Sequence, residues 1–155
     1  MATIQKKLFV LSELATKFNN ANITWAIGAS MLLFFKGYTS EFHDIDIMVS
    51  EEDDAKLKEI MLTVGELQPQ NHNEAYKTKC FLEFVVDGVD IDVMAGFTIV
   101  NKGKEFYYPL KENSIHDYIE VNGVEIPLGS IKEWRNYYSL MGREEKVKII
   151  DRNND

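Results

Sequence analysis

A chain of 155 residues, 45% of them hydrophobic, is long enough to bury the core of one globular domain. Its formal net charge of −8 at pH 7 argues against an extended nucleic-acid surface, because such surfaces are basic. A single cysteine, Cys80, excludes an internal disulfide, and no apolar run is long enough to span a membrane. Because the N-terminus also lacks a signal-peptide pattern, we expect a cytoplasmic protein with one domain over residues 1–155.

Hydrophobic spacing and turn residues divide the chain into helices and strands. Helices are expected at residues 4–20, 31–36, 51–64, 131–141 and 143–150. Strands are expected at residues 23–27, 43–49, 81–86, 89–93, 98–100, 105–108 and 124–127. Residues 65–78 are expected to form a loop, and Asp87-Gly88 is a strong signal for a tight hairpin turn. This order of elements predicts an α+β or α/β fold with a mixed sheet flanked by helices.

Two copies of one acidic pattern stand out in the chain, at residues 43–49 (HDIDIMV) and 89–94 (VDIDVM). Because strand side chains alternate, the acids lie on one face and the large apolar residues on the other. Buried acids at every second position are unfavourable unless a cation lies between them, and carboxylates suit hard ions such as Mg²⁺. The pattern therefore predicts a metal held by two neighbouring strands, with Asp44 and Asp46 from the first of them. The alternative is a row of acids facing solvent.

The segment Gly28-Ala29-Ser30 lies between an expected strand and an expected helix. Glycine permits close approach of a phosphate to the backbone, and the Ser30 hydroxyl offers a hydrogen-bond donor. The alternative is an ordinary strand-to-helix turn in which Ser30 caps the helix. The acids further along the chain favour the phosphate-binding interpretation.

The order of these three features resembles the nucleotidyltransferase fold of the DNA polymerase β superfamily. That pattern is a glycine-containing turn, a helix, an acid–apolar–acid strand such as Asp44-Ile45-Asp46, and a further acid on a later strand. Small members are the most similar, namely the lincosamide and aminoglycoside nucleotidyltransferases and the AbiEii-type toxins. The resemblance covers roughly residues 23 to 150 and includes a C-terminal helical segment at 129–151.

This resemblance implies that Asp44, Asp46 and Asp92 hold Mg²⁺ or Mn²⁺ and carry catalysis. It further implies that Gly28, Ala29 and Ser30 bind an NTP such as ATP, whose monophosphate is transferred to a hydroxyl acceptor by two-metal-ion catalysis. Asp90 lies on the same strand face as Asp92 and is the alternative third carboxylate. Two positions depart from the family pattern. Ala29 replaces a usual glycine or serine, and a lysine found in many relatives is absent near Tyr138.

The acceptor is left open between a small molecule, such as an antibiotic, and a macromolecule. The chain has little room for a separate acceptor domain, so a homodimer could build the acceptor pocket across its interface. Arg143, Lys146 and Lys148 could meet phosphates, although a solvated helix face is the commoner interpretation of such a run. The rival function is a non-catalytic module of the same fold that senses a nucleotide or binds a partner protein.

Overall fold

The structure is a computed structural model that describes residues 2–70 and 78–153. Its helices are α1 (Ile4–Asn20), α2 (Ala29–Phe35), α3 (Asp54–Val64), α4 (Ile131–Leu140) and α5 (Glu144–Asn153), with a short 3-10 helix η1 (Glu112–Ser114). Its strands are β1 (Trp25–Ile27), β2 (Ile45–Val49), β3 (Glu66–Leu67), β4 (Cys80–Val86), β5 (Val89–Ala95), β6 (Phe97–Asn101), β7 (Lys104–Tyr108), β8 (Asp117–Val121) and β9 (Val124–Leu128).

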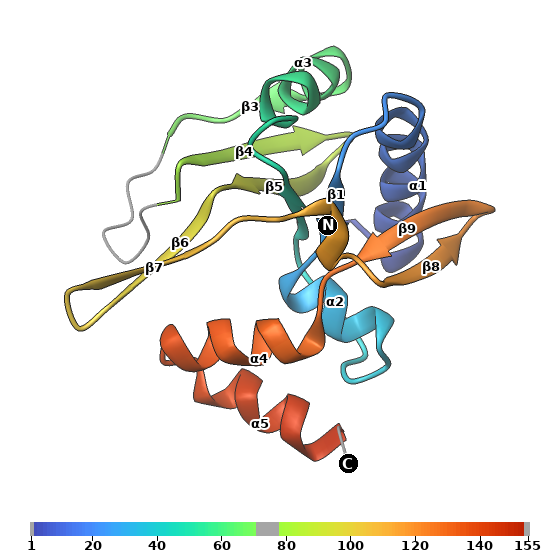
Figure 1. The fold of residues 1–155 in the computed structure, drawn as a ribbon. Helices are drawn as coiled ribbons and strands as arrows, with labels where there is room; N and C mark the ends of the chain where they lie inside the picture. The colour runs from blue at the N-terminus through green and yellow to red at the C-terminus, as the bar shows by residue number, and fades with distance from the viewer. Residues whose placement is uncertain (1, 71–77, 154–155) are drawn as a thin grey trace.

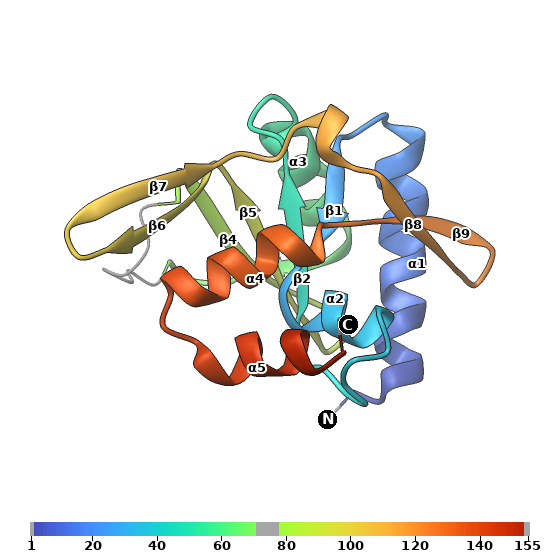
Figure 2. The same ribbon diagram turned by 60° about the horizontal axis from the view of Figure 1, so that its bottom comes forward.

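The strands form a mixed seven-stranded sheet with the order β3-β4-β5-β2-β1-β9-β8. The β2–β5 and β1–β9 pairs are parallel and the other neighbours are antiparallel. α1 and α3 pack against each other and the sheet, whereas α4 and α5 form a separate pair (Figure 1). The β6–β7 hairpin projects away from the sheet (Figure 2). The predicted α+β class with a mixed sheet is therefore confirmed.

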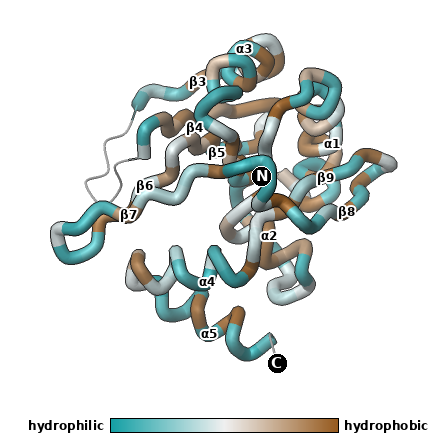
Figure 3. Tube along the Cα trace, viewed as in Figure 1, coloured by the Kyte–Doolittle hydropathy of each residue, from teal (hydrophilic) through white to brown (hydrophobic). Residues whose placement is uncertain are grey.

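Buried side chains from all the main helices and the central strands form one hydrophobic core. Trp25, Phe18 and Phe84 are among its largest fully buried members. Hydrophobic residues are concentrated along the central strands, while the tip of the β6–β7 hairpin is hydrophilic (Figure 3). Asp46, described below, lies on the buried central strand β2, where an unpaired charge is costly.

The hairpin turn at Asp87-Gly88 fixes which residues face each other across β4 and β5. Both turn residues have positive φ, +54° and +80°, as a type I′ turn requires. The turn pairs Val86 with Val89, and the register then places Glu83 opposite Asp92. The tight turn expected from the sequence is thus confirmed, and it sets the position of Asp92.

The expected start of the third helix was wrong. α3 begins at Asp54 rather than at residue 51, and the Ser50 Oγ before it donates to the Asp53 carboxylate at 3.0 Å. That carboxylate also accepts from the Thr24 N–H at 2.8 Å, so it links the start of β1 to the turn before α3. The sequence analysis also missed β8 and β3.

The loop expected at residues 65–78 contains β3, and its residues 71–77 lie outside the described part of the chain. Within residues 2–70 and 78–153, no helix has the length and apolar character needed to cross a membrane.

Candidate active site

The acids Asp46 and Asp92 lie side by side on the two central strands β2 and β5. These strands are parallel, and their register places Asp46 directly opposite Asp92. Asp46 is only 9% exposed, and its neighbours Ile45 and Ile47 are fully buried in the core on the other strand face. Asp44 precedes β2 and is half-buried. The expectation that the two acidic patterns form adjacent strands is confirmed.

The close approach of these carboxyl groups changes their protonation. Burial raises the pKa of Asp46 well above its ordinary value, and the charges of Asp92 and Asp44 raise it further. Burial, followed by the charges of Asp44 and Glu83, raises the pKa of Asp92 to about 7. A side-chain hydrogen bond joins Asp46 to Asp92, and it favours the protonated form of Asp46 and the ionised form of Asp92. A cation between the two carboxyl groups would offset the repulsion that raises both pKa values.

The Gly28 turn is tied directly to the acidic strand. The Gly28 N–H donates to the Asp46 carbonyl at 3.0 Å, and β1 pairs with β2 through Ile27 and Ile47. Ala29 follows with a positive φ of +53°, and Ser30 lies in the first turn of α2. The structure therefore brings the predicted turn and the predicted acids together.

Gly28 is required by packing within the protein itself. A Cβ at this position would lie 2.4 Å from the Trp134 ring, which also closely approaches Gly129. Trp134 is 4% exposed and stacks on Phe97 with ring centroids 5.7 Å apart. From the sequence, Gly28 was interpreted as a phosphate-binding residue or as part of an ordinary strand-to-helix turn. The structure adds a packing reason, because the Trp134 ring of α4 lies where a Cβ of residue 28 would be.

A central cavity of about 390 Å³ lies over the acids, between the sheet and the C-terminal helices. The turn lines it through Ala29 and Ser30. Lys146 of α5 and Arg143, in the turn between α4 and α5, line it from the C-terminal part of the chain. The three predicted acids line it as well. Lys148 is exposed and does not line it. Arg143 and Lys146, whose commoner interpretation was a solvated helix face, therefore lie at the site.

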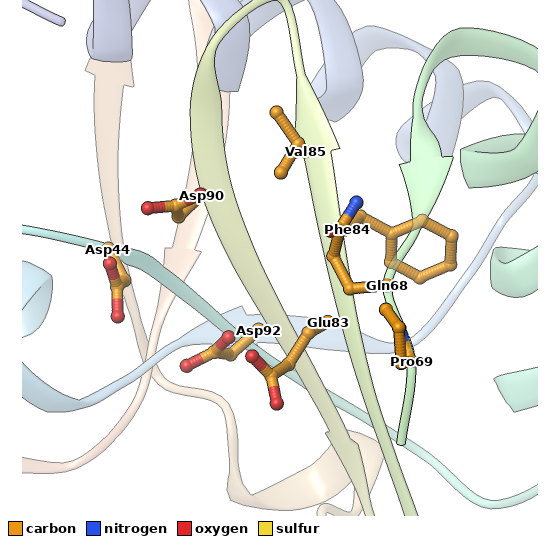
Figure 4. A pocket seen from close by; sticks show the side chains of 8 residues that line it. All are labelled: Asp44, Gln68, Pro69, Glu83, Phe84, Val85, Asp90 and Asp92. Carbon is orange, nitrogen blue, oxygen red and sulfur yellow. The ribbon is translucent and has the colours of Figure 1, made fainter. Parts of the chain in front are cut away.

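A second pocket of about 400 Å³ adjoins the central cavity and shares Asp44 and Asp92 with it. We call it the acidic pocket, because Glu83 and Asp90 add two further carboxyl groups and none of the described residues that line it is basic. Figure 4 shows these four acidic side chains grouped together, with Glu83 on β4 and Asp90 and Asp92 on β5. The charge of Asp90 also raises the pKa of Asp44, after the larger effect of burial. This pocket suits a positively charged ligand.

The two pockets give the site opposite electrical characters on its two sides. Basic side chains from the C-terminal part of the chain reach one side of the acids, and further acids surround the other.

A family model described as aminoglycoside-2''-adenylyltransferase matches residues 10–154 of the sequence. The chain belongs to the aminoglycoside-2''-adenylyltransferase family. Membership in this family makes it a nucleotidyltransferase, as the resemblance in the sequence predicted.

Solved structures related to the chain share its fold. A candidate nucleotidyltransferase from Thermotoga maritima superposes with a TM-score of 0.76 at 23% identity, covering 97% of this chain and 94% of its own. The antibiotic-resistance factor ANT(2'')-Ia gives a TM-score of 0.68 at 12% identity, covering 96% and 84%. The lincosamide antibiotic adenylyltransferase LnuA gives 0.61 at 12% identity and covers 97% of both chains. A comparison with curated proteins gave no match. The nucleotidyltransferase fold is thus confirmed.

Glu83 is the site residue that the sequence analysis overlooked. It lies on β4, directly opposite Asp92 across the hairpin. The sequence contained the information needed to place Glu83, because a two-residue turn at Asp87-Gly88 fixes every residue pair along β4 and β5. Counting back from this turn along the sequence is enough to place Glu83 beside Asp92.

The positive φ of Ala29 predicts that Ala29→Gly stabilises the protein. A left-handed conformation destabilises an alanine by roughly 1–2 kcal/mol. Glycine removes this strain, but its greater freedom in the unfolded chain cancels about half of the gain. We expect the free energy of unfolding to rise by about 0.5–1 kcal/mol in urea denaturation. Ala55→Gly is the control, because Ala55 is exposed inside α3, where glycine should destabilise. Equal destabilisation by both substitutions would contradict this account of Ala29.

Proposed function

We propose that this protein transfers a nucleoside monophosphate from an NTP to a hydroxyl group of a small, positively charged acceptor. The observation that carries the proposal is the Asp46–Asp92 pair, with Asp44 beside it, at the junction of two pockets of opposite character. Membership in the aminoglycoside-2''-adenylyltransferase family supports the reaction and favours an aminoglycoside antibiotic as the acceptor. The acidic pocket supports a cationic acceptor independently of the family, because its carboxylates would pair with ammonium groups.

The three acids have the donor chemistry of a site for Mg²⁺ or Mn²⁺. Among residues 2–70 and 78–153, no three acidic, histidine or cysteine side chains already stand in the arrangement of a cation site. The raised pKa values of Asp46 and Asp92, caused by burial and by the neighbouring acids, nevertheless support a need for positive charge at this place. We therefore assign Asp44, Asp46 and Asp92 as the residues that would hold the metal. A divalent cation there would polarise the reacting phosphate and stabilise charge on the leaving pyrophosphate.

The protein's own groups would position the reactants on either side of the acids. The NTP phosphates would lie in the central cavity, against Ser30 and the backbone of Gly28 and Ala29. The acceptor would lie in the acidic pocket with its hydroxyl facing Asp92. As the hydroxyl oxygen bonds to the α-phosphorus, the bond to pyrophosphate breaks and the hydroxyl proton passes to Asp92. Burial and the charges of Asp44 and Glu83 raise the pKa of Asp92 in the metal-free protein, and a bound cation would favour the ionised carboxylate that can accept the proton.

The test of this function is direct detection of the product. The protein is incubated with ATP, Mg²⁺ and either an aminoglycoside or an uncharged polyol, and the acceptor is analysed by mass spectrometry. We expect a nucleoside monophosphate adduct on the aminoglycoside. ATP binding without an adduct on any acceptor would favour the non-catalytic module that senses a nucleotide, and the absence of ATP binding would contradict both the transferase and that nucleotide sensor.

Glu83→Gln should weaken acceptor recognition specifically. Removing one carboxylate from the acidic pocket should raise KM for the aminoglycoside by roughly tenfold, since a charge-assisted contact contributes about 1.5–3 kcal/mol. KM for ATP should stay unchanged. Glu120→Gln is the matched control, because Glu120 is exposed on β8 and does not line the pocket. An unchanged acceptor KM in Glu83→Gln would place the acceptor elsewhere.

A further inference from the structure

Asp44 is the one acid of the three whose backbone lies outside the sheet. Asp46 and Asp92 are held in register by the pairing of β2 with β5, but Asp44 comes one residue before β2 begins. The segment at residues 36–44, which joins α2 to β2, contains neither helix nor strand. The position of Asp44 therefore depends on contacts made by this segment and not on the hydrogen bonds of the sheet.

Phe42 anchors the segment two residues before Asp44. Its side chain is 4% exposed and packs against Phe34 of α2, with ring centroids 4.9 Å apart. The Phe42 carbonyl belongs to the planar peptide that leads into His43. A hydrogen bond that fixes this carbonyl therefore also fixes the direction in which the chain enters His43 and Asp44.

That hydrogen bond comes from Lys7, in the first turns of α1 (Figure 2). Lys7 Nζ donates to the Phe42 carbonyl at 2.8 Å and lies over the Phe42 ring, 5.2 Å from its centroid. Lys7 is half-buried, and none of the ion pairs among the described residues includes it. Burial and the charge of Asp90 raise the pKa of Asp44, and the charges of His43 and Lys7 oppose that rise. The ammonium therefore lies near enough to Asp44 to act on it.

We propose that Lys7 is a positioning residue for the metal site, which holds the Phe42 carbonyl so that the Asp44 carboxylate stays beside Asp46 and Asp92. This inference rests on the proposed function and adds the residue, remote in sequence, that completes its set of acids. Lys7 lines neither the central cavity nor the acidic pocket, so it would act through the chain and not by touching a substrate. Groups that orient metal-binding side chains typically change metal affinity by about 10- to 100-fold.

The charge of Lys7 and its hydrogen bond have opposite consequences for metal binding. A positive charge near the acids repels a cation, so removing the charge alone would tighten Mn²⁺ binding. Removing the hydrogen bond releases the segment that carries Asp44, and this would weaken Mn²⁺ binding. The direction of the change therefore distinguishes a positioning role from a purely electrostatic one.

The test is a titration of Mn²⁺ at pH 8, followed by electron paramagnetic resonance, in which Lys7→Met keeps an apolar stem but neither the donor nor the charge. We expect its dissociation constant for Mn²⁺ to rise by about tenfold. Lys7→Arg keeps both the charge and a donor, and it should restore most of the affinity. Lys6→Met is the matched control, because it removes the same charge from an ion pair with Asp87 in which both side chains are well exposed. It should change the affinity by less than about twofold.

The number of ions bound per chain separates misplacement of Asp44 from misfolding. A partly unfolded Lys7→Met protein would bind fewer ions at unchanged affinity, and that result would overturn the inference. Unchanged or tighter Mn²⁺ binding by Lys7→Met would overturn it as well, and so would equal losses in Lys7→Met and Lys6→Met. These outcomes leave the proposed function intact. If the wild type binds no Mn²⁺, the proposed metal site fails, and this inference fails with it.

Discussion

Replacing Asp92 by asparagine should lower kcat for nucleotidyl transfer by about 10²- to 10⁴-fold, the usual cost of losing a general base. Asp92 lies in both pockets, and the hairpin register fixes it beside Asp46. An asparagine has nearly the same shape but cannot accept the hydroxyl proton. Because that proton moves only in the transition state, KM for ATP should change much less than kcat.

The matched control is Asp90→Asn, which removes one carboxylate from the same strand and the same pocket. Asp90 is exposed and lies beyond the Asp46–Asp92 pair. Pyrophosphate release should therefore fall far less in this variant. If Asp90→Asn loses turnover while Asp92→Asn retains it, Asp90 is the third carboxylate and the assignment of Asp92 is wrong.

Replacing Asp46 by asparagine should abolish Mg²⁺-dependent binding of ATP, the second large effect that we expect. Asp46 is the most buried of the three acids, and its carboxylate would face the metal from the centre of the sheet. Asparagine retains the size and one acceptor oxygen but not the negative charge. Calorimetry with ATP in the presence of Mg²⁺ measures the loss, and binding equal to that of the wild type would place the metal elsewhere.

The same Asp46→Asn variant should be more stable than the wild type without metal, and the gain should depend on pH. The raised pKa values mean that the folded protein binds protons more tightly than the unfolded chain. Its stability therefore falls as pH rises from about the ordinary aspartate value of 3.8 toward 7, the pKa of Asp92 in the fold. The gain from Asp46→Asn should be greatest above pH 7 and vanish below pH 4. Thermal unfolding in EDTA at several pH values measures it.

The central part of the site was predictable because it depends on local rules. Alternation places Asp44 and Asp46 on one strand face, and the Asp87-Gly88 turn fixes the partner of every residue on β5. The pairing of Asp46 with Asp92 needed one further step, the parallel contact of β2 with β5. The resemblance to nucleotidyltransferases supplied that step, since spacing alone does not determine which strands become neighbours.

The C-terminal side of the site was harder to predict. Lys146 and Lys148 are both charged residues on one short helix, and only the packing of Val147 and Ile150 determines which lysine faces the cavity. Gly28 shows a similar limit, because its need for space comes from Trp134, more than a hundred positions later in the chain. β8 was missed because its alternating exposed residues, Tyr118 and Glu120, leave few apolar positions to mark a strand.

The most direct test of the account is a titration of Mn²⁺ into the protein at pH 8, followed by electron paramagnetic resonance. We expect the wild type to immobilise Mn²⁺, because the three acids would be ionised and would share the ion. The double variant Asp44→Asn/Asp46→Asn should leave the Mn²⁺ signal as it is in buffer, while the Asp90→Asn control should still bind. Equal Mn²⁺ binding by the wild type and the double variant would contradict the claim that these carboxylates form the metal site.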